Sequence, residues 1–216
     1  MPRAPTSPQT ALALIPPPTW GGARKGAGRP RTGSAGVPHA ARPALARSHP
    51  AHVTLRVLPH VWSLRSRRSF RIIEAALRGV FPRAGFGVVH FSVQGNHVHV
   101  IAEAAGAASL SRGIQALAIR IAKSLNRLMG RRGPVFADRF HAHVLRTPTE
   151  VRRAISYVAG NFASHVARLG KRVAAGFVDP YCSTALRFLA TQQKAAPPLA
   201  SARTWLLAEG WLRAPA

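Results

Sequence analysis

The sequence predicts an α+β fold in which an antiparallel sheet carries helices on one face and follows a disordered basic N-terminal arm. Three observations predict it. From about residue 51 onward, segments that alternate apolar and polar residues are interleaved with segments whose apolar residues recur every three or four positions. The hydrophobic fraction of 47% is sufficient for a core. Residues 1–50 contain no acidic residue and show neither periodicity, which is typical of a disordered segment.

The first half of the folded region predicts a strand, a helix and a hairpin. Residues 52–57 alternate apolar and polar side chains, as in a half-buried strand. Residues 69–80 place apolar residues at helical spacing. Residues 87–93 and 97–103 are two further strand candidates, and the intervening Gln-Gly-Asn at 94–96 is a hairpin signal.

The second half predicts a long amphipathic helix, a strand and another helix. Residues 110–129 form the first helix, and Gly130 is its C-terminal stop. Residues 136–145 are extended and aromatic, which favours a strand. Residues 147–150 (TPTE) combine an N-cap threonine, a proline in the first turn and a glutamate three residues after the cap, and so open a helix that runs to about residue 169.

The element order strand-helix-strand-strand-helix-strand, followed by a helix, is that of a ferredoxin-like split unit around an antiparallel sheet. We therefore divide the chain into a basic arm at residues 1–50, a folded domain at residues 51–190 and a tail at residues 191–216. The tail contains a short amphipathic element around residues 204–212, which we expect to dock on the core or on a partner.

The charge balance indicates a polyanionic partner. The 216-residue chain has 31 Lys and Arg against 6 Asp and Glu, a formal net charge of +25. Such self-repulsion destabilises a compact protein unless a polyanion is bound, and nucleic acid is the first candidate. So few acids nearly exclude a catalytic carboxylate cluster. The single cysteine, Cys182, excludes an internal disulfide and a cysteine-based zinc site. No run approaches a membrane span, so we expect a cytoplasmic protein without membrane partners.

Two groups of basic residues are candidate DNA-binding sites. Within the arm, residues 21–31 (GGARKGAGRPR) contain a Gly-Arg-Pro core that resembles an AT-hook, a segment that lies in the DNA minor groove. A general phosphate-binding tail is the alternative interpretation. The second group lies on and after the long helix, where it contacts DNA phosphates or is a solvated helix face. The candidates are Arg24, Lys25, Arg29 and Arg31 in the arm, and Arg120, Lys123, Arg127, Arg131 and Arg132 in the domain.

His97 and His99 are the sharpest feature of the sequence. Residues two apart on a strand point to the same face, so both imidazoles emerge on one side while Val98 packs on the other. Two histidines placed in this way can hold a divalent metal and leave room for a third ligand and a substrate oxygen. Ordinary surface histidines are the alternative, since the chain contains ten.

Residues 51 to about 190 resemble the HUH single-tyrosine transposases, in the branch that includes the repetitive-palindrome-associated tyrosine transposases. The resemblance depends on four segments in order: residues 96–103 (NHVHVIAE), 133–140 (GPVFADRF), 147–152 (TPTEVR) and 155–161 (ISYVAGN). It implies a ferredoxin-like catalytic domain that cleaves and rejoins single-stranded DNA, for example at a hairpin foot, through a covalent 5'-phosphotyrosine.

The resemblance also implies roles for individual residues. His97 and His99 become ligands of Mg²⁺ or Mn²⁺, Tyr157 the nucleophile and Asn161 the residue that completes the metal site. Tyr157 and Asn161 share one helix face because they are four residues apart. The family often has proline after this asparagine, whereas Phe162 stands here. That departure concerns the helix end and not the reacting groups.

Several alternatives stay open at this point. Tyr157 and Tyr181 are the two tyrosines of the chain, and Tyr181 follows Pro180 in an expected loop. Glu103 shares the strand parity of the histidines, so it either orients an imidazole or pairs with an arginine. A domesticated, non-catalytic DNA-binding protein and a basic RNA-binding protein are the rival functions. The sequence does not decide between a monomer and a homodimer.

Overall fold

The computed structural model describes residues 44–81, 84–192, 197 and 199–215. The predicted arm up to residue 43, with its AT-hook-like segment and Arg24, Lys25, Arg29 and Arg31, lies outside these residues. The secondary structure elements, in chain order, are β1 (Ala51–Arg56), α1 (Arg67–Val80), β2 (Phe86–Val93), β3 (His97–Ala104), α2 (Ala107–Leu128), β4 (His141–Val144), α3 (Pro148–Arg168), α4 (Ser183–Gln192), α5 (Trp205–Ala208) and the 3₁₀ turn η1 (Gly210–Arg213).

The four strands form one antiparallel sheet in the order β2-β3-β1-β4. This order confirms the ferredoxin-like prediction, because the first and third strands are central and the second and fourth are the edges. Pairing places Thr54 of β1 opposite His99 of β3 on one side and opposite His141 of β4 on the other. Side chains that are directly paired in this way emerge on the same face of the sheet.

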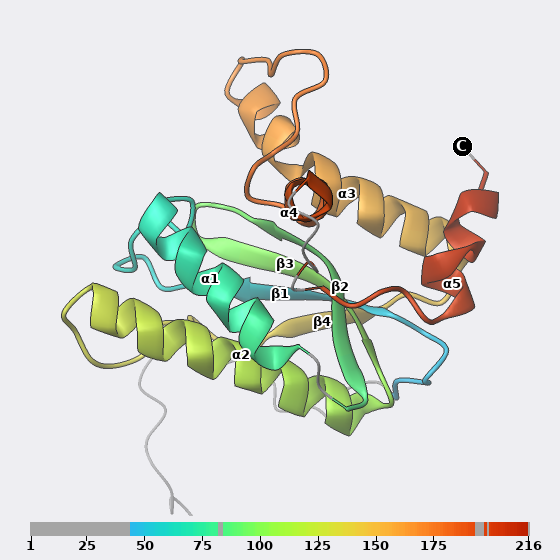
Figure 1. Ribbon diagram of the computed structural model, residues 1–216, viewed down its shortest axis with the longest axis horizontal. Helices are drawn as coiled ribbons and strands as arrows, with labels where there is room; N and C mark the ends of the chain where they lie inside the picture. Colours follow the sequence, from blue (N-terminus) through green and yellow to red (C-terminus); the bar gives the residue numbers. More distant parts are fainter. Residues whose placement is uncertain (1–43, 82–83, 193–196, 198, 216) are drawn as a thin grey trace, which may run out of the picture. The chain divides into compact units, whose positions relative to one another are not determined.

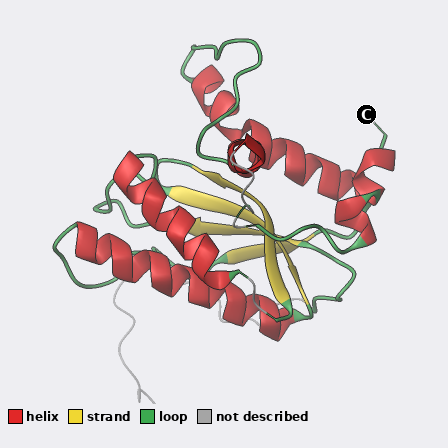
Figure 2. Cartoon of the chain, viewed as in Figure 1, coloured by secondary structure: helices red, strands yellow, loops and turns green. Residues whose placement is uncertain are grey.

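Helices cover both faces of the sheet (Figure 1). Helices α1 and α2 lie on one face, as predicted, and pack an apolar core that includes Val98, Val100 and Ile114. Helix α3 and the short α5 lie on the opposite face, where a smaller cluster includes Val151, Val158 and Leu207. The strands are therefore sandwiched between two helical layers (Figure 2), and the third helix adds a layer that the sequence did not assign.

The helix ends follow local chemistry. Ser66 caps α1 by accepting a hydrogen bond from the Ser69 backbone at 3.1 Å, so this helix begins two residues before the predicted start. Helix α3 begins where the sequence predicts, with the complete Thr147–Glu150 capping box. Gly130 follows α2 at φ 62°, a left-handed conformation that favours glycine and explains the stop at this position.

The predicted strand at residues 136–145 is wrong over its first half. Only His141–Val144 pairs as β4, and Phe136 forms an isolated bridge with Val57. Between them, the Asp138 side chain accepts a 2.6 Å hydrogen bond from the Arg139 backbone. Such a local bond competes with the strand ladder, so the chain turns here instead of continuing along β1.

Both ends of the described chain pack on the domain. Leu45 is buried in the larger core, so the fold begins before residue 51 and the predicted arm boundary is too late. Helix α4 has no counterpart among the predicted elements. After it, the Ala200 backbone donates a hydrogen bond to Val88, and Arg152 of α3 donates one to the Ala214 carbonyl at 2.7 Å. The predicted amphipathic element therefore docks on the core. Within the described ranges, no helix is long and apolar enough to cross a membrane.

Candidate active site

Strand β3 presents the two histidines of the H-x-H motif on the face that α3 covers. Val98, between them, is buried in the opposite core, as strand alternation requires. His97 is half-buried and His99 is 5% exposed. Their ring centroids lie 4.7 Å apart and their planes meet at 84°. The two imidazoles therefore form one compact pair on this face.

Helix α3 places Tyr157 over this pair. The Tyr157 ring meets the His99 ring edge-on with centroids 5.1 Å apart, and its hydroxyl lies 3.5 Å from His99 Nε2. The side chain is nevertheless 46% exposed, so an incoming substrate can reach the hydroxyl. Because both residues belong to the same chain, the tyrosine and the histidines meet without a second copy.

Two residues of β1 join the site that the sequence analysis did not identify. His52 Nε2 lies 3.2 Å from His99 Nδ1, and Thr54 Oγ1 lies 3.1 Å from the same atom. His52 also approaches the Tyr157 ring, at 5.9 Å between centroids. The sequence could have indicated these residues in one way. The polar positions of the first strand alternate with its apolar ones, and the ferredoxin-like order makes β1 the neighbour of β3.

Burial keeps the imidazoles neutral at physiological pH. Desolvation, together with the neighbouring His97 and His52, lowers the pKa of His99 to about 3. Desolvation, aided by His143 and His141, lowers the pKa of His52 to about 4. The pKa of His97 is also lowered, first by burial and then by His165 and Arg56. Neutral imidazole is the form that offers a nitrogen lone pair to a metal.

The donor set fits a divalent metal. His97 Nδ1 lies 2.7 Å from Asn96 Oδ1 and His99 Nδ1 is held by β1, so each ring directs its Nε2 toward the site, where that of His99 also faces the Tyr157 hydroxyl. Asn161, one turn beyond Tyr157, is 2% exposed, and its Nδ2 has no hydrogen-bond partner in the described part of the chain. The amide nitrogen donates hydrogen bonds and does not ligate a metal, so only Oδ1 of this buried amide could serve as a third metal ligand. Within the described ranges no three His, Cys, Asp or Glu side chains form a metal-binding group. A metal at this site would therefore depend on His97, His99 and the Asn161 amide oxygen.

A solved structure shares the fold of this chain. It is a REP-associated tyrosine transposase bound to a REP hairpin, with 15% sequence identity and a TM-score of 0.51. The match covers 76% of this chain and 92% of that protein. This chain has the fold of a REP-associated tyrosine transposase. No family model and no curated protein sequence matches the chain.

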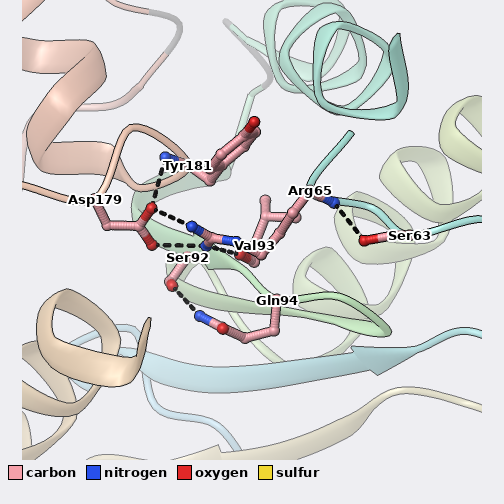
Figure 3. A network of polar contacts seen from close by, with 7 residues as sticks. All are labelled: Ser63, Arg65, Ser92, Val93, Gln94, Asp179 and Tyr181. Atoms are coloured by element: carbon pink, nitrogen blue, oxygen red, sulfur yellow. Dashed lines mark hydrogen bonds and ion pairs between the residues drawn. The ribbon is translucent and has the colours of Figure 1, made fainter. Parts of the chain in front are cut away.

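The segment that follows the tyrosine helix of this transposase-like fold is tied to the sheet by a buried ion pair (Figure 3). Both guanidinium NH groups of Arg65 donate to the Asp179 carboxylate, at 2.9 and 2.8 Å, and one also donates to the Val93 carbonyl. The Val93 backbone in turn donates to the Tyr181 carbonyl. This network joins the hairpin to the chain beyond α3 and so holds the C-terminal half of that helix over β3.

Phe162 and Tyr181 take structural positions around the same guanidinium. The guanidinium carbon of Arg65, Cζ, lies 3.8 Å from the centroid of the Phe162 ring and 4.4 Å from that of the Tyr181 ring. The Tyr181 ring also packs edge-on against Phe70, with centroids 4.9 Å apart. Phe162 therefore supports the end of α3. Tyr181 belongs to the large core, whereas Tyr157 meets the histidines.

Of the predicted basic residues, those on α2 do not lie beside the tyrosine. Arg120, Lys123 and Arg127 are exposed on the helical layer opposite α3. Arg131 and Arg132 follow α2 in the loop that leads to Phe136, whose bridge to Val57 joins it to the end of β1. That end carries Arg56, the partner of His97 in the sheet. The loop arginines therefore lie at the histidine end of the sheet.

Glu103 has a structural role. Its buried carboxylate accepts hydrogen bonds from the backbones of Arg203 and Thr204 and from the Thr204 hydroxyl, at 2.7 to 3.0 Å. The Arg203 Nε lies 3.9 Å away. The carboxylate thus anchors the start of α5, and none of these hydrogen bonds involves a histidine.

Proposed function

We propose that this protein is a metal-dependent transposase that cleaves and rejoins single-stranded DNA through a 5'-phosphotyrosine on Tyr157. One observation carries the proposal: the Tyr157 hydroxyl lies 3.5 Å from His99 Nε2, above the H-x-H pair, on a side chain that is 46% exposed. A core aromatic would have its hydroxyl enclosed. Here the hydroxyl of an exposed ring is aimed at the residues best suited to bind a metal.

The reaction exchanges one phosphoester for another. Tyr157 Oη forms a bond to the scissile phosphorus, the bond from phosphorus to the 3' oxygen breaks, and the proton lost by the phenol ends on that oxygen, so the upstream strand leaves with a 3' hydroxyl. An unperturbed phenol has a pKa of about 10 and is a weak nucleophile at neutral pH. A divalent ion at His97, His99 and Asn161 would polarise the phosphate and so compensate for this weakness.

The reverse step rejoins DNA without an energy source. Attack of a 3' hydroxyl on the phosphotyrosine restores a phosphodiester and returns the proton to Tyr157. The role of the chain is to hold the ring while the leaving strand is exchanged. The edge-on contacts with His99 and His52 restrict the Tyr157 ring, which keeps its oxygen near the reacting phosphate.

The charge distribution supports DNA as the substrate. All six acidic residues have partners within the chain: Glu74 with Arg78, Asp179 with Arg65, Glu209 with Arg213, Glu103 with the start of α5, Glu150 with the α3 cap and Asp138 with the Arg139 backbone. They cannot neutralise 31 basic residues. The fold neighbour was solved with a DNA hairpin, which supports the same class of partner.

The test is the formation of a covalent complex. Labelled single-stranded hairpin DNA is incubated with the protein and Mg²⁺ or Mn²⁺, and a protein–DNA band that resists denaturation is expected. Tyr157→Phe should bind DNA and give no band, whereas the matched variant Tyr181→Phe should behave like the wild type. A band from Tyr157→Phe and none from Tyr181→Phe would overturn the assignment. Tight binding without any band would instead identify a non-catalytic DNA-binding protein.

A further inference from the structure

A pocket of about 380 Å³ opens beside Tyr157, and neither His97 nor His99 lines it. It lies where β1 and β4 meet the first turns of α3, and its volume falls within the range of about 300–1,000 Å³ usual for small-ligand sites. Leu145 and Ala154 contribute apolar surface to its wall. Tyr157 lines the pocket, so the part of the substrate next to the scissile phosphate lies close to it.

The lining suits a flat aromatic ligand. His52 from β1, His143 from β4 and Tyr157 from α3 place three rings around the pocket. Planar rings stack on nucleobases of any sequence because every base has a π-face. Arg153, also at the pocket, supplies a cation for the phosphate attached to such a base.

Glu150 gives the pocket a hydrogen-bond acceptor. Its Oε2 accepts hydrogen bonds from two backbone N–H groups, those of Arg146 at 2.6 Å and of the N-cap residue Thr147 at 3.1 Å. Oε1 is therefore the oxygen left for a ligand in the pocket that this residue lines. Carboxylates accept hydrogen bonds from amino groups of bases. Thymine lacks such a group, and the two carbonyl oxygens that flank its ring N–H would face the carboxylate.

We propose that this pocket holds the nucleobase next to the scissile phosphate and selects a base with an exocyclic amino group. The inference rests on the proposed function, because it assumes that DNA reaches Tyr157. It assigns His143 and Glu150, neither of which the sequence analysis gave a role in the site, as specificity-determining residues. Stacking by His143 holds the base, and Glu150 Oε1 distinguishes adenine, cytosine and guanine from thymine.

The first experiment varies the DNA. Hairpin substrates that carry each base, or an abasic nucleotide, at the position next to the cleavage point are compared by the rate of covalent adduct formation. Thymine and the abasic site should react about tenfold more slowly than the preferred base. Equal rates for all five substrates would overturn the inference and leave the proposed function intact.

The second experiment varies the protein, with a matched control on the same strand. His143→Ala should reduce the rate about fivefold to tenfold and weaken the difference between a base and an abasic site. His141→Ala removes an exposed histidine two residues away that does not line the pocket, and should match the wild type. Glu150→Gln retains the cap, since glutamine also serves at this position, and replaces the free oxygen by a donor. It should lose the discrimination against thymine.

Photocrosslinking tests whether a base occupies the pocket, and it does not require DNA cleavage. A 5-iodocytosine, which keeps the exocyclic amino group, is placed at successive positions of the hairpin, and the protein is Tyr157→Phe so that no adduct competes. The position next to the expected cleavage point should crosslink to peptides that contain His143 or His52. Crosslinks at this position that map elsewhere would overturn the pocket assignment. If Tyr157→Phe gave no crosslink at any position and the wild-type protein gave no adduct, the pocket assignment and the proposed function would both be wrong.

Discussion

The two faces of the sheet are built from alternate residues of the same strands and differ in almost every property. Toward α1 and α2, β3 sends Val98 and Val100, both at most 1% exposed, into a large aliphatic core. Toward α3, the same strand sends His97 and His99, which meet polar residues of β1 and an exposed tyrosine. The comparison teaches that the face toward α1 and α2 supplies most of the apolar burial that stabilises the fold. The face toward α3 buries less apolar surface and carries the candidate active site.

The site face is itself divided along α3. In its first half, Val151, Ala154 and Val158 are buried against Ile101 of the sheet. Beyond Tyr157 the inward positions are Asn161 and His165, whose ring lies 6.0 Å from that of His97. Apolar packing therefore holds the start of the helix, and polar contacts lie beneath its second half. Tyr157 stands at the boundary between these regions.

Substitutions of neighbouring residues of β3 should show the largest difference between the two faces of the sheet. His97→Ala should reduce adduct formation more than about a hundredfold, because a metal ligand contributes several kcal/mol to the transition state. Its affinity for DNA and its melting temperature should remain near wild type, since phosphate attraction is dispersed over many arginines. Adduct assays, fluorescence anisotropy and thermal melts measure the three quantities.

The adjacent variant is the control. Val98→Ala should lower the free energy of unfolding by about 1–3 kcal/mol and leave the adduct rate of the folded protein unchanged. If His97→Ala cleaved normally with Mg²⁺ present, the assignment of the histidine face would be wrong.

The core face should respond most in stability. Ile121 of α2 is fully buried, so Ile121→Ala should destabilise the protein by about 2–5 kcal/mol through lost burial and a cavity. Ile119, two residues earlier and 46% exposed, is the matched control, and Ile119→Ala should change stability by less than about 0.5 kcal/mol. Urea denaturation measures both. Similar losses for the two variants would contradict the packing of α2.

The ion pair that follows the tyrosine helix predicts an intermediate effect. Asp179 is buried, and Asp179→Ala would leave Arg65 without its partner, so we expect a loss of about 1–3 kcal/mol. Hydrogen exchange should also become faster in the C-terminal half of α3. The comparison is Glu74→Ala, which removes the exposed Glu74–Arg78 pair and should cost about 0.5 kcal/mol or less. Equal effects would show that the Arg65 network does not hold the helix.

The smallest effect on stability is expected from the N-terminal arm. Deletion of residues 1–43 removes six basic residues and no acid, so the logarithmic salt slope of single-strand binding should flatten by up to about 4. The melting temperature should not change. Deletion of residues 1–48 also removes Leu45 from the core, and this variant should melt at a lower temperature. A stability loss from the shorter deletion would show that the fold extends further toward the N-terminus.

The sequence alone determined the features that depend on neighbours along the chain. Strand alternation placed His97 and His99 on one face, and helical spacing placed Tyr157 and Asn161 on one side of α3. The capping box located the start of that helix because its hydrogen bonds close within four residues. The order of elements was sufficient to predict the ferredoxin-like sheet.

The tertiary structure decided which distant residues complete the site. His52 joins His99 through the register of β1 against β3, and no local pattern separates it from the other histidines of the chain. Asp179 meets Arg65 across 114 residues, and the pocket beside Tyr157 combines β1, β4 and α3. Such contacts depend on how the layers pack on one another. Local propensity can specify each strand and helix, but only the packed sheet brings these side chains within hydrogen-bonding distance.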